Sequence, residues 1–171
     1  NRKRNGNNTM QVDLVVLGSG PGGYTAAFRA ADLGLTVALI ERDENLGGVC
    51  LNVGCIPSKA LLHAANVVSG VRDMSAHGLT YGEPNIDLKK LVGWKSKIVG
   101  QLTAGLTSLA KQRKVQVVQG VGTFTSPSVI RVHADSGDTD IEFKHAIIAA
   151  GSEPVALPDF PNDEPRLIDS T

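Results

Sequence analysis

The first forty residues alternate between short apolar runs and one helical segment. Residues 12–17 are a run of mainly branched apolar side chains, which is typical of a strand buried on both faces. A glycine cluster follows, and residues 24–33 then predict a helix that ends at Gly34. Residues 36–40 predict a second buried strand, which ends at Glu41. A strand–helix–strand unit of this kind crosses over right-handed and predicts a parallel sheet.

Two longer helices are predicted after this unit. A glycine-rich loop over residues 45–54 precedes the first, which we expect over residues 57–74 with Pro57 in its first turn. Asp87 is a good N-terminal cap for the second helix. Apolar residues repeat along one broad face of this second helix, and the pattern predicts that the face packs against the core. Its members are Leu88, Leu91, Val92, Ile98, Val99, Leu102, Leu106 and Leu109.

The hydrophobic period shortens after the second long helix. Short strands joined by turns are predicted over residues 115–118, 122–125, 129–132 and 140–143. One more buried strand is expected over residues 146–151, and the prolines beyond it indicate an extended connection. The sequence therefore predicts an α/β fold, with a Rossmann-like parallel sheet and a small antiparallel β-element added to it.

Composition indicates one globular domain but does not indicate a function. The chain has 171 residues, of which 42% are hydrophobic, enough for one well-filled domain. Lys and Arg together number 17, as do Asp and Glu, so charge gives no argument for nucleic acid or a membrane surface as a partner. Apolar runs such as Leu14–Leu17 are too short to span a bilayer. We expect residues 1–9, which are polar and basic, to form a flexible tail or linker before one domain over residues 10–171.

A glycine pattern, Gly18-x-Gly20-x-x-Gly23, lies between the first predicted strand and helix. Gly18 permits a tight turn, Gly20 lets a pyrophosphate approach the backbone, and Gly23 lets the helix pack closely on the strand. The helix N-terminus offers free N–H groups to phosphate oxygens, and Glu41 is placed to accept hydrogen bonds from a ribose. The pattern and its context predict a dinucleotide site, and they fit FAD and NAD equally well.

Both cysteines lie in the segment GGVCLNVGCIPSK, over residues 47–59. Cys50 and Cys55 could be inert core thiols, half of a metal site, a structural disulfide or a redox pair. A zinc site needs about four ligands, and the histidines show no grouping of that kind. A structural disulfide would close only a short loop and add little stability. Two cysteines in a chain of this length make a reducing, intracellular setting the default.

The redox interpretation sets a condition on the backbone. In a regular helix, Cα atoms five residues apart are separated by about 8.6 Å, whereas a disulfide seldom tolerates more than about 7 Å. The pair can therefore close only where the chain departs from regular helix, and Gly54 could supply that freedom. Cys55 is expected at a helix N-terminus, which favours the thiolate that disulfide exchange requires. Lys59 lies one turn further and could hold positive charge near a bound cofactor.

Together these motifs resemble the pyridine nucleotide-disulfide oxidoreductases. The cysteine segment follows the glycine pattern and Glu41, and residues 149–152 match the family's second flavin-side signature except at Ala150, where threonine is usual. The resemblance extends from about Val12 to Thr171. Within the family, three residues favour the branch that oxidises dihydrolipoyl groups over the glutathione and mercuric reductases: Leu51, Ile56 and Ser58.

The resemblance implies a flavoprotein that binds FAD at this first glycine pattern. Electrons would pass from dihydrolipoyl thiols to a Cys50–Cys55 disulfide, then through FAD to NAD⁺, with Cys50 as the outer thiol and Cys55 facing the flavin. Glu41 would bind the adenosine ribose, Gly122 would bring its backbone to the adenine, and Lys59 would lie near the reactive edge of the flavin ring. The implied cofactor-binding residues are Gly18, Gly20, Pro21, Gly22, Gly23, Glu41, Arg42, Gly47, Gly48, Val49, Cys50, Lys59, Gly122, Ala150 and Gly151.

The resemblance also implies parts and partners beyond this chain. The family's NAD-binding domain, the rest of its FAD domain and its interface domain with a His–Glu acid/base pair would follow, so we expect this chain to be the N-terminal part of the enzyme and incomplete for turnover. His63 is expected to be a packing or surface residue instead of that base. Expected partners are the dihydrolipoyl domain of a 2-oxoacid dehydrogenase complex and, at full length, a second copy, with no metal, nucleic acid or membrane.

Several alternatives remain open at this point. The expected location is the bacterial cytoplasm, with the mitochondrial matrix second. Mercuric reductase, or another disulfide reductase of this fold, is the alternative activity. A non-catalytic nucleotide-binding fragment is the alternative of a different class.

Overall fold

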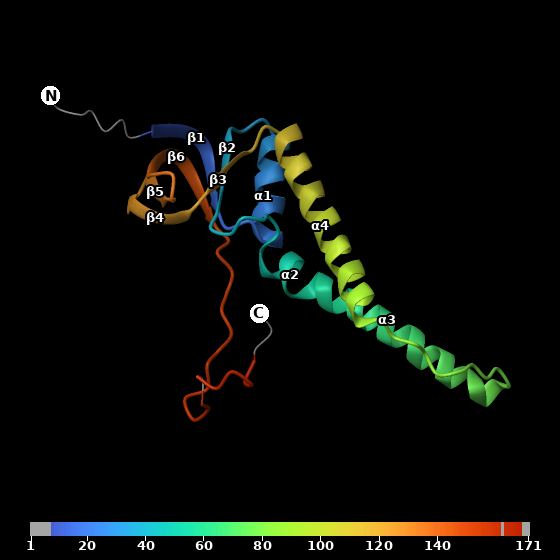
Figure 1. The fold of residues 1–171 in the computed structure, drawn as a ribbon. Coiled ribbons are helices and arrows are strands. Elements are labelled where there is room, and N and C mark those ends of the chain that lie inside the picture. Colours follow the sequence, from blue (N-terminus) through green and yellow to red (C-terminus); the bar gives the residue numbers. More distant parts are fainter. Residues whose placement is uncertain (1–7, 162, 169–171) are drawn as a thin grey trace.

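The computed structural model describes residues 8–161 and 163–168, and it confirms the predicted α/β class (Figure 1). The strands form one six-stranded sheet in the order β3-β2-β1-β6-β5-β4. The first four of these strands are parallel to one another, and β5 and β4 continue the sheet in antiparallel pairing. The elements are β1 (Asn8–Leu17), α1 (Pro21–Asp32), β2 (Val37–Glu41), α2 (Gly48–Asn52), α3 (Cys55–Asp73), η1 (Met74–His77), α4 (Leu88–Gln112), β3 (Gln116–Gln119), β4 (Val121–Ser126), β5 (Val129–His133) and β6 (Thr139–Ile148).

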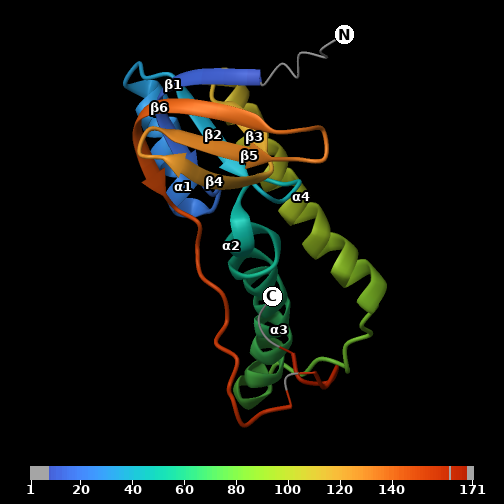
Figure 2. The ribbon, with the colours of Figure 1, turned by 90° about the vertical axis from the view of Figure 1, so that its left-hand side faces the viewer.

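The two central strands, β1 and β2, are buried on both faces over residues 14–16 and 37–41, which explains their nearly continuous apolar sequence. Alternate residues of β1 and β2, such as Leu14 and Leu39, form one cluster with Phe28 of α1 and Ala110 of α4. The residues between them form a second cluster with the antiparallel strands. Helices thus cover one face of the parallel sheet and the antiparallel strands cover the other, as Figure 2 shows. The members of the second cluster are Val12, Val15, Ala38, Ile40, Ile130, Val132, Ile141 and Phe143.

Two strand boundaries differ from the sequence prediction. β1 already begins at Asn8, so residues 8 and 9 of the expected tail are paired with β6, while residues 1–7 lie outside the described residues. The strands expected over residues 140–143 and 146–151 are a single strand, β6, which ends at Ile148, so residues 149–151 lie beyond it. They are continuous because β1 offers one unbroken parallel edge along the whole length of β6.

The glycine-rich loop is shorter than the sequence suggested. The helix α2 lies within the expected loop over residues 45–54, and α3 begins at Cys55, two residues before Pro57. Such a short helix is marginal by itself, so tertiary contacts must hold it in place. Asp87 caps α4 as predicted, because its side chain accepts a hydrogen bond from the backbone N–H of Lys90 at 3.0 Å.

The prediction that the broad apolar face of α4 packs on the core is wrong for most of its length. The outer part of α4 and the helix α3 project away from the sheet (Figure 1). Leu88, Val92 and Leu102 are 69%, 50% and 45% exposed. Leu106 and Ala110, nearer the sheet, do pack on the core. Helical spacing identified an apolar face, but only its C-terminal end reaches the sheet. Of the helices described, none has the length and hydropathy to cross a membrane.

Candidate functional site

A cleft of about 420 Å³ lies at the carboxyl ends of β1, β2 and β6. Ligands of open α/β sheets bind at this edge, outside the carboxyl ends of the strands. The walls come from the loop after β1, the end of β2, the start of α2, the start of β4 and the segment after β6. The lining residues are Leu17, Gly18, Ser19, Gly20, Pro21, Ile40, Glu41, Arg42, Asp43, Gly48, Val49, Cys50, Gly120, Val121, Gly122, Ala149, Ala150, Gly151 and Ser152.

The cleft brings together most of the residues that the sequence proposed for the cofactor. Those on its wall are Gly18, Gly20, Pro21, Glu41, Arg42, Gly48, Val49, Cys50, Gly122, Ala150 and Gly151. Gly22, Gly23 and Gly47 belong to the same segments without lining the cleft, and Lys59 lies on α3, outside it. Five segments of the sequence therefore converge on one site, and they include the glycine pattern and the two downstream signatures.

Close packing accounts for two of the fingerprint glycines. A Cβ atom on Gly23 would lie 1.8 Å from the carbonyl oxygen of Gly18, so only glycine lets α1 come this near to β1. Gly18 has a φ of +97°, and its Cβ would lie 2.3 Å from the carbonyl oxygen of Ala149. By contrast, a Cβ on Gly20 would have nothing within 4 Å. The backbone at Gly20 is thus open to a ligand, while its neighbours fix the turn.

The N-terminus of α1 is prepared for an anion. Gly20 is its N-cap, Pro21 occupies the first turn, and no side chain caps it. The N–H groups of the first helical turn lack intrahelical partners, and together with the helix dipole they favour negative charge. A dinucleotide pyrophosphate fits this open cradle of backbone donors.

Ser19 is a site residue that the sequence analysis did not single out. Its side chain is buried, and its hydroxyl donates to Glu41 Oε2 at 2.5 Å. The backbone N–H of Gly47 donates to the carbonyl oxygen of Ser19 at 3.0 Å, so Ser19 links the fingerprint loop to β2 and to the entrance of α2. The signal available in the sequence was a hydroxyl residue two positions after one strand and an acid at the end of the neighbouring parallel strand.

The backbone between the cysteines is irregular, as the redox interpretation requires. α2 ends at Asn52, α3 starts at Cys55, and Gly54 between them has φ −113° and ψ −105°. The backbone N–H groups of Val53 and Gly54 both donate to the carbonyl oxygen of Val49, at 3.0 Å and 2.7 Å. Both thiols are free in this structure, Cys50 half-buried and Cys55 exposed.

The two thiols are in contact, and the contact changes the acidity of Cys50. A hydrogen bond with the Cys55 side chain, helped by burial, raises the pKa of Cys50 above that of an ordinary thiol, while the positive charge of Lys59 acts in the opposite direction. Lys59 is therefore close enough to act on the cysteine pair. Cys50 lines the cleft and Cys55 does not. Which thiol meets the flavin and which meets the substrate stays a prediction.

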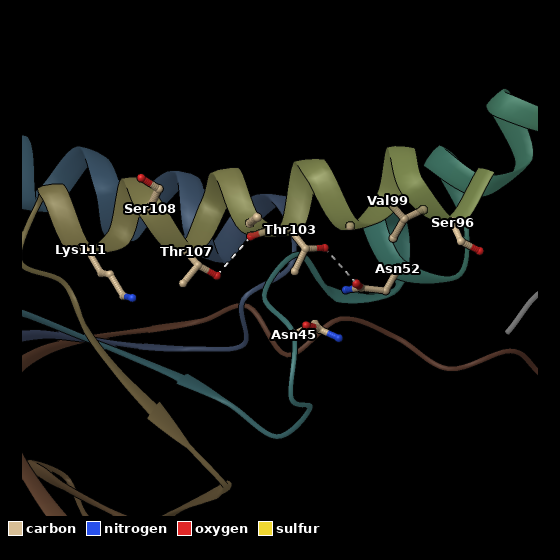
Figure 3. Close-up of a pocket in the computed structure, with 10 residues that line it drawn as sticks. Asn45, Asn52, Ser96, Val99, Thr103, Thr107, Ser108 and Lys111 are labelled. Atoms are coloured by element: carbon tan, nitrogen blue, oxygen red, sulfur yellow. Dashed lines mark hydrogen bonds between the residues drawn. The ribbon is translucent and has the colours of Figure 1, made fainter. Parts of the chain in front are cut away.

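A second groove, of about 570 Å³, runs along α4 (Figure 3). Amides and hydroxyls dominate its wall, Lys111 is its one charged residue, and neither cysteine lines it. His63 lies elsewhere on the helix pair: it is exposed, and its ring centre is 6.5 Å from that of Trp94 on α4, which fits the packing or surface role expected for it. Among the described residues, no three of the types His, Cys, Asp and Glu are grouped so as to hold a metal ion.

The chain belongs to the pyridine nucleotide-disulphide oxidoreductase family, whose model matches residues 12–170. Among solved structures, it is similar to the flavoprotein disulfide reductase RclA from Escherichia coli, solved as a Cu(II) complex. That likeness has a TM-score of 0.72 and 29% identity, and it covers 86% of this chain and 30% of RclA. The α/β architecture is therefore that of a flavoprotein disulfide reductase.

Its curated relatives include dihydrolipoyl dehydrogenases. The enzyme of Vibrio cholerae is 54% identical over 162 residues, which cover 95% of this chain and 34% of that protein. The mitochondrial enzyme of Pisum sativum is 46% identical over 161 residues, covering 93% of this chain and 32% of that protein. The chain thus spans about a third of the length of the curated relatives it matches.

Proposed function

We propose that this chain carries the FAD site and the reactive dithiol of a dihydrolipoyl dehydrogenase. The observation that carries the proposal is the contact between Cys50 and Cys55 across a break between two helices, beside a dinucleotide cleft. A structural disulfide needs no such cleft, and a zinc site needs more ligands than this pair provides. The identity of about half of all residues to dihydrolipoyl dehydrogenases supports the choice within the family.

FAD is the cofactor we propose for the cleft. The uncapped N-terminus of α1 would hold the pyrophosphate, and Glu41, Arg42 and Gly122 would surround the adenosine end. The start of α2, with Gly48, Val49 and Cys50, would line the flavin end, where Cys55 would face the flavin and Cys50 would be the outer thiol. Gly22, Gly23, Gly47, Lys59, Ala150 and Gly151 complete the proposed cofactor-binding set. When bound, FAD supplies a two-electron route between the cysteine pair and NAD⁺.

The cysteines would perform thiol–disulfide exchange with the substrate. A dihydrolipoyl thiolate attacks Sγ of Cys50, a bond to the substrate sulfur forms, and the Cys50–Cys55 bond breaks with its electron pair on Cys55. The second substrate thiol then displaces Cys50 and closes the lipoyl ring. Two electrons and two protons have left the substrate, and the positive charge of Lys59 would stabilise thiolate at the pair.

The remaining parts of the reaction are proposed for the protein beyond this chain. They are an NAD-binding domain and an interface domain whose His–Glu pair acts across a homodimer. The partner would be a dihydrolipoyl domain of a 2-oxoacid dehydrogenase complex. A bacterial cytoplasm is the proposed location. Five bacterial relatives at 48–54% identity support it, whereas the mitochondrial pea enzyme is 46% identical and the Bacillus subtilis enzyme 43%.

Steady-state kinetics of the full-length protein test this function. We expect NADH formation from dihydrolipoamide and NAD⁺, and its loss in Cys50→Ser and in Cys55→Ser. The 171-residue chain alone should give no turnover. NADPH-dependent reduction of Hg(II) or of glutathione disulfide that exceeds dihydrolipoamide oxidation would assign a different reductase. A colourless full-length protein without flavin absorbance would contradict the proposal altogether.

A further inference from the structure

We infer that Asn52 is a positioning residue that holds Cys50 in place for closure with Cys55, and so sets the reduction potential of the pair. The inference rests on the proposed redox function of the two cysteines. Asn52 lies between them in the sequence, at the last residue of α2. Its own side chain takes no part in the chemistry, and it acts through the backbone that carries Cys50.

The amide of Asn52, at the last residue of α2, is hydrogen-bonded to the N-terminal entrance of this short helix, which carries Cys50. Its Nδ2 group donates to the carbonyl oxygen of Leu46 at 3.2 Å and to that of Gly48 at 3.0 Å. Leu46 precedes α2 and Gly48 begins it, so the two bonds fix the segment on either side of its entrance. A helix of five residues has too few internal hydrogen bonds to hold its own geometry. The side chain of Asn52 therefore supplies restraint that α2 lacks.

The other half of the amide connects α2 to α4. The hydroxyl of Thr103, in the middle of α4, donates to Oδ1 of Asn52 at 3.4 Å, and Figure 3 shows the two side chains pointing toward each other. The hydroxyl of Thr107, one turn further, donates to the carbonyl oxygen of Thr103 at 3.1 Å. With these bonds, both amide N–H groups and the amide oxygen of Asn52 have partners.

The helix α4 is itself anchored to the core of the protein. Its C-terminal end packs on the core of the parallel sheet, where Ala110 is 1% exposed and Leu106 joins the apolar cluster. The guanidinium of Arg113, which follows α4, lies 3.0 Å from the carboxylate of Asp32 at the end of α1. Asn52 thus connects α2, which carries Cys50, to α4, and α4 is packed on the core of the sheet.

Restraint of the short helix that carries Cys50 makes closure of the Cys50–Cys55 disulfide more favourable. Closing the pair joins Sγ of Cys50 to Sγ of Cys55, while two electrons and two protons pass to an oxidant such as oxidised dithiothreitol, which becomes the dithiol. The equilibrium constant of this exchange rises with the fraction of time that the two thiols spend in contact, because preorganised groups react as at high effective concentration. Loss of the Asn52 side-chain hydrogen bonds should therefore favour the dithiol over the disulfide and raise the reduction potential of the Cys50–Cys55 pair.

The test is the reduction potential of the pair in the full-length holoenzyme. The protein is equilibrated in buffers of oxidised and reduced dithiothreitol without pyridine nucleotide, and alkylation followed by peptide mass analysis counts the closed pairs. For Asn52→Ala we expect a closure constant about tenfold lower, a rise of about 30 mV for a two-electron couple. For Thr103→Val, which keeps the amide bonds to Leu46 and Gly48, we expect a change of about threefold. Ser108→Ala, on the wall of the same groove, is the matched control and should leave the potential unchanged.

The outcomes separate this inference from the proposed function. If the unchanged protein forms no Cys50–Cys55 disulfide in any buffer, the redox function itself fails. If that protein closes the pair and Asn52→Ala closes it equally well, the positioning role alone is overturned. Where Asn52→Ala does not fold, as thermal unfolding would show, Thr103→Val decides: a raised potential supports the role and an unchanged one overturns it. An equal shift in Ser108→Ala would also overturn it, because the effect would then belong to the groove in general.

Discussion

Ser19 donates two hydrogen bonds to a single carboxylate oxygen of Glu41, one from its backbone N–H at 2.9 Å and one from its hydroxyl at 2.5 Å. The other carboxylate oxygen accepts from the backbone N–H of Asp43 at 3.0 Å. Ser19 is fully buried and Glu41 is 6% exposed. Since Ser19 follows β1 and Glu41 ends β2, these bonds tie two parallel strands together at the edge of the cleft.

The substitution Glu41→Gln tests how much these hydrogen bonds contribute to stability. Glutamine keeps the shape but removes the charge and one acceptor oxygen, so the Ser19 and Asp43 donors cannot all remain paired. Hydrogen bonds to a charged group contribute about 1.5–3 kcal/mol, and we expect a loss of unfolding free energy of that order, measured by urea denaturation. Bound flavin, measured by absorbance after gel filtration, should fall as well. The control Asp135→Asn removes an exposed carboxylate from the turn before β6. An equal loss in both variants would contradict the specific role of Glu41.

A pair of glycine substitutions tests the close packing of α1. In Gly23→Ala, the new Cβ would overlap the carbonyl oxygen of Gly18, so α1 must move, and such overpacking costs about 1–3 kcal/mol. In Gly105→Ala, on α4, the new Cβ meets nothing within 4 Å, and alanine favours a helix by about 1 kcal/mol over glycine. Thermal unfolding should therefore show a lower midpoint for the first variant and a higher one for the second. A higher midpoint for Gly23→Ala would refute the close contact.

The acidity of Cys50 should depend on Cys55. The hydrogen bond with Cys55 is the main reason that the pKa of Cys50 is raised, and a raised pKa keeps the thiol protonated to higher pH. In Cys55→Ala that bond is absent, so the rate of Cys50 alkylation by iodoacetamide should rise at a lower pH than in the unchanged protein. Cys55→Ser keeps a hydroxyl at the position and should shift the profile less. Superimposable profiles for Cys50 in the unchanged protein and in Cys55→Ala, resolved by peptide mass, would contradict the contact.

Low pH should destabilise the folded protein by protonating Asp13, a residue of β1. Its carboxylate accepts from Lys144 Nζ at 2.7 Å and from the hydroxyl and backbone N–H of Thr36, at 2.7 Å and 2.9 Å. The hydrogen bond from Lys144, followed by those from Thr36, holds the pKa of Asp13 well below its usual range. A carboxyl group with a lowered pKa in the folded state stabilises the fold above its unfolded pKa of about 3.9, and this stabilisation is lost as pH falls below that value.

The substitution Asp13→Asn isolates that contribution. Urea midpoints between pH 6 and pH 3 should fall more steeply for the unchanged protein than for this variant, because asparagine has no proton to gain. Asp135→Asn, which leaves Asp13 in place, should keep the steep acid limb. Equal slopes for the unchanged protein and Asp13→Asn would show that other groups govern the acid limb.

Two leucines on α4 separate the exposed part of its apolar face from the packed part. Leu102 is 45% exposed, and Leu102→Gln should change the unfolding free energy of this chain by no more than about 0.5 kcal/mol. Leu106 packs on the core, and Leu106→Gln should cost about 1–3 kcal/mol because it buries an amide among apolar side chains. Chemical denaturation of both variants checks the difference. Similar losses in both would mean that the outer half of α4 is also packed.

The local parts of this protein follow from the sequence. Runs of branched apolar residues specify β1 and β2, because strands covered on both faces need apolar side chains at most of their positions. The spacing of Gly18, Gly20 and Gly23 specifies the turn from β1 into α1, because side chains at Gly18 and Gly23 would overlap neighbouring backbone atoms, while Gly20 stays open. Helix geometry alone shows that the backbone must break between Cys50 and Cys55 before the thiols can meet, and the structure has that break at Val53 and Gly54.

Only the tertiary structure decides which residues of these elements contact one another. The apolar face of α4 has helical spacing throughout, yet burial depends on which residues stand opposite it, and in the described chain the sheet reaches only its C-terminal end. Glu41 lies 22 positions from Ser19, and Thr103 lies 51 positions from Asn52, so no local pattern predicts these two contacts. Spacing along the sequence therefore determines the elements and the chemistry that each carries. The packing of the sheet determines which of those residues lie within hydrogen-bonding distance, because that distance depends on how the elements are placed in space.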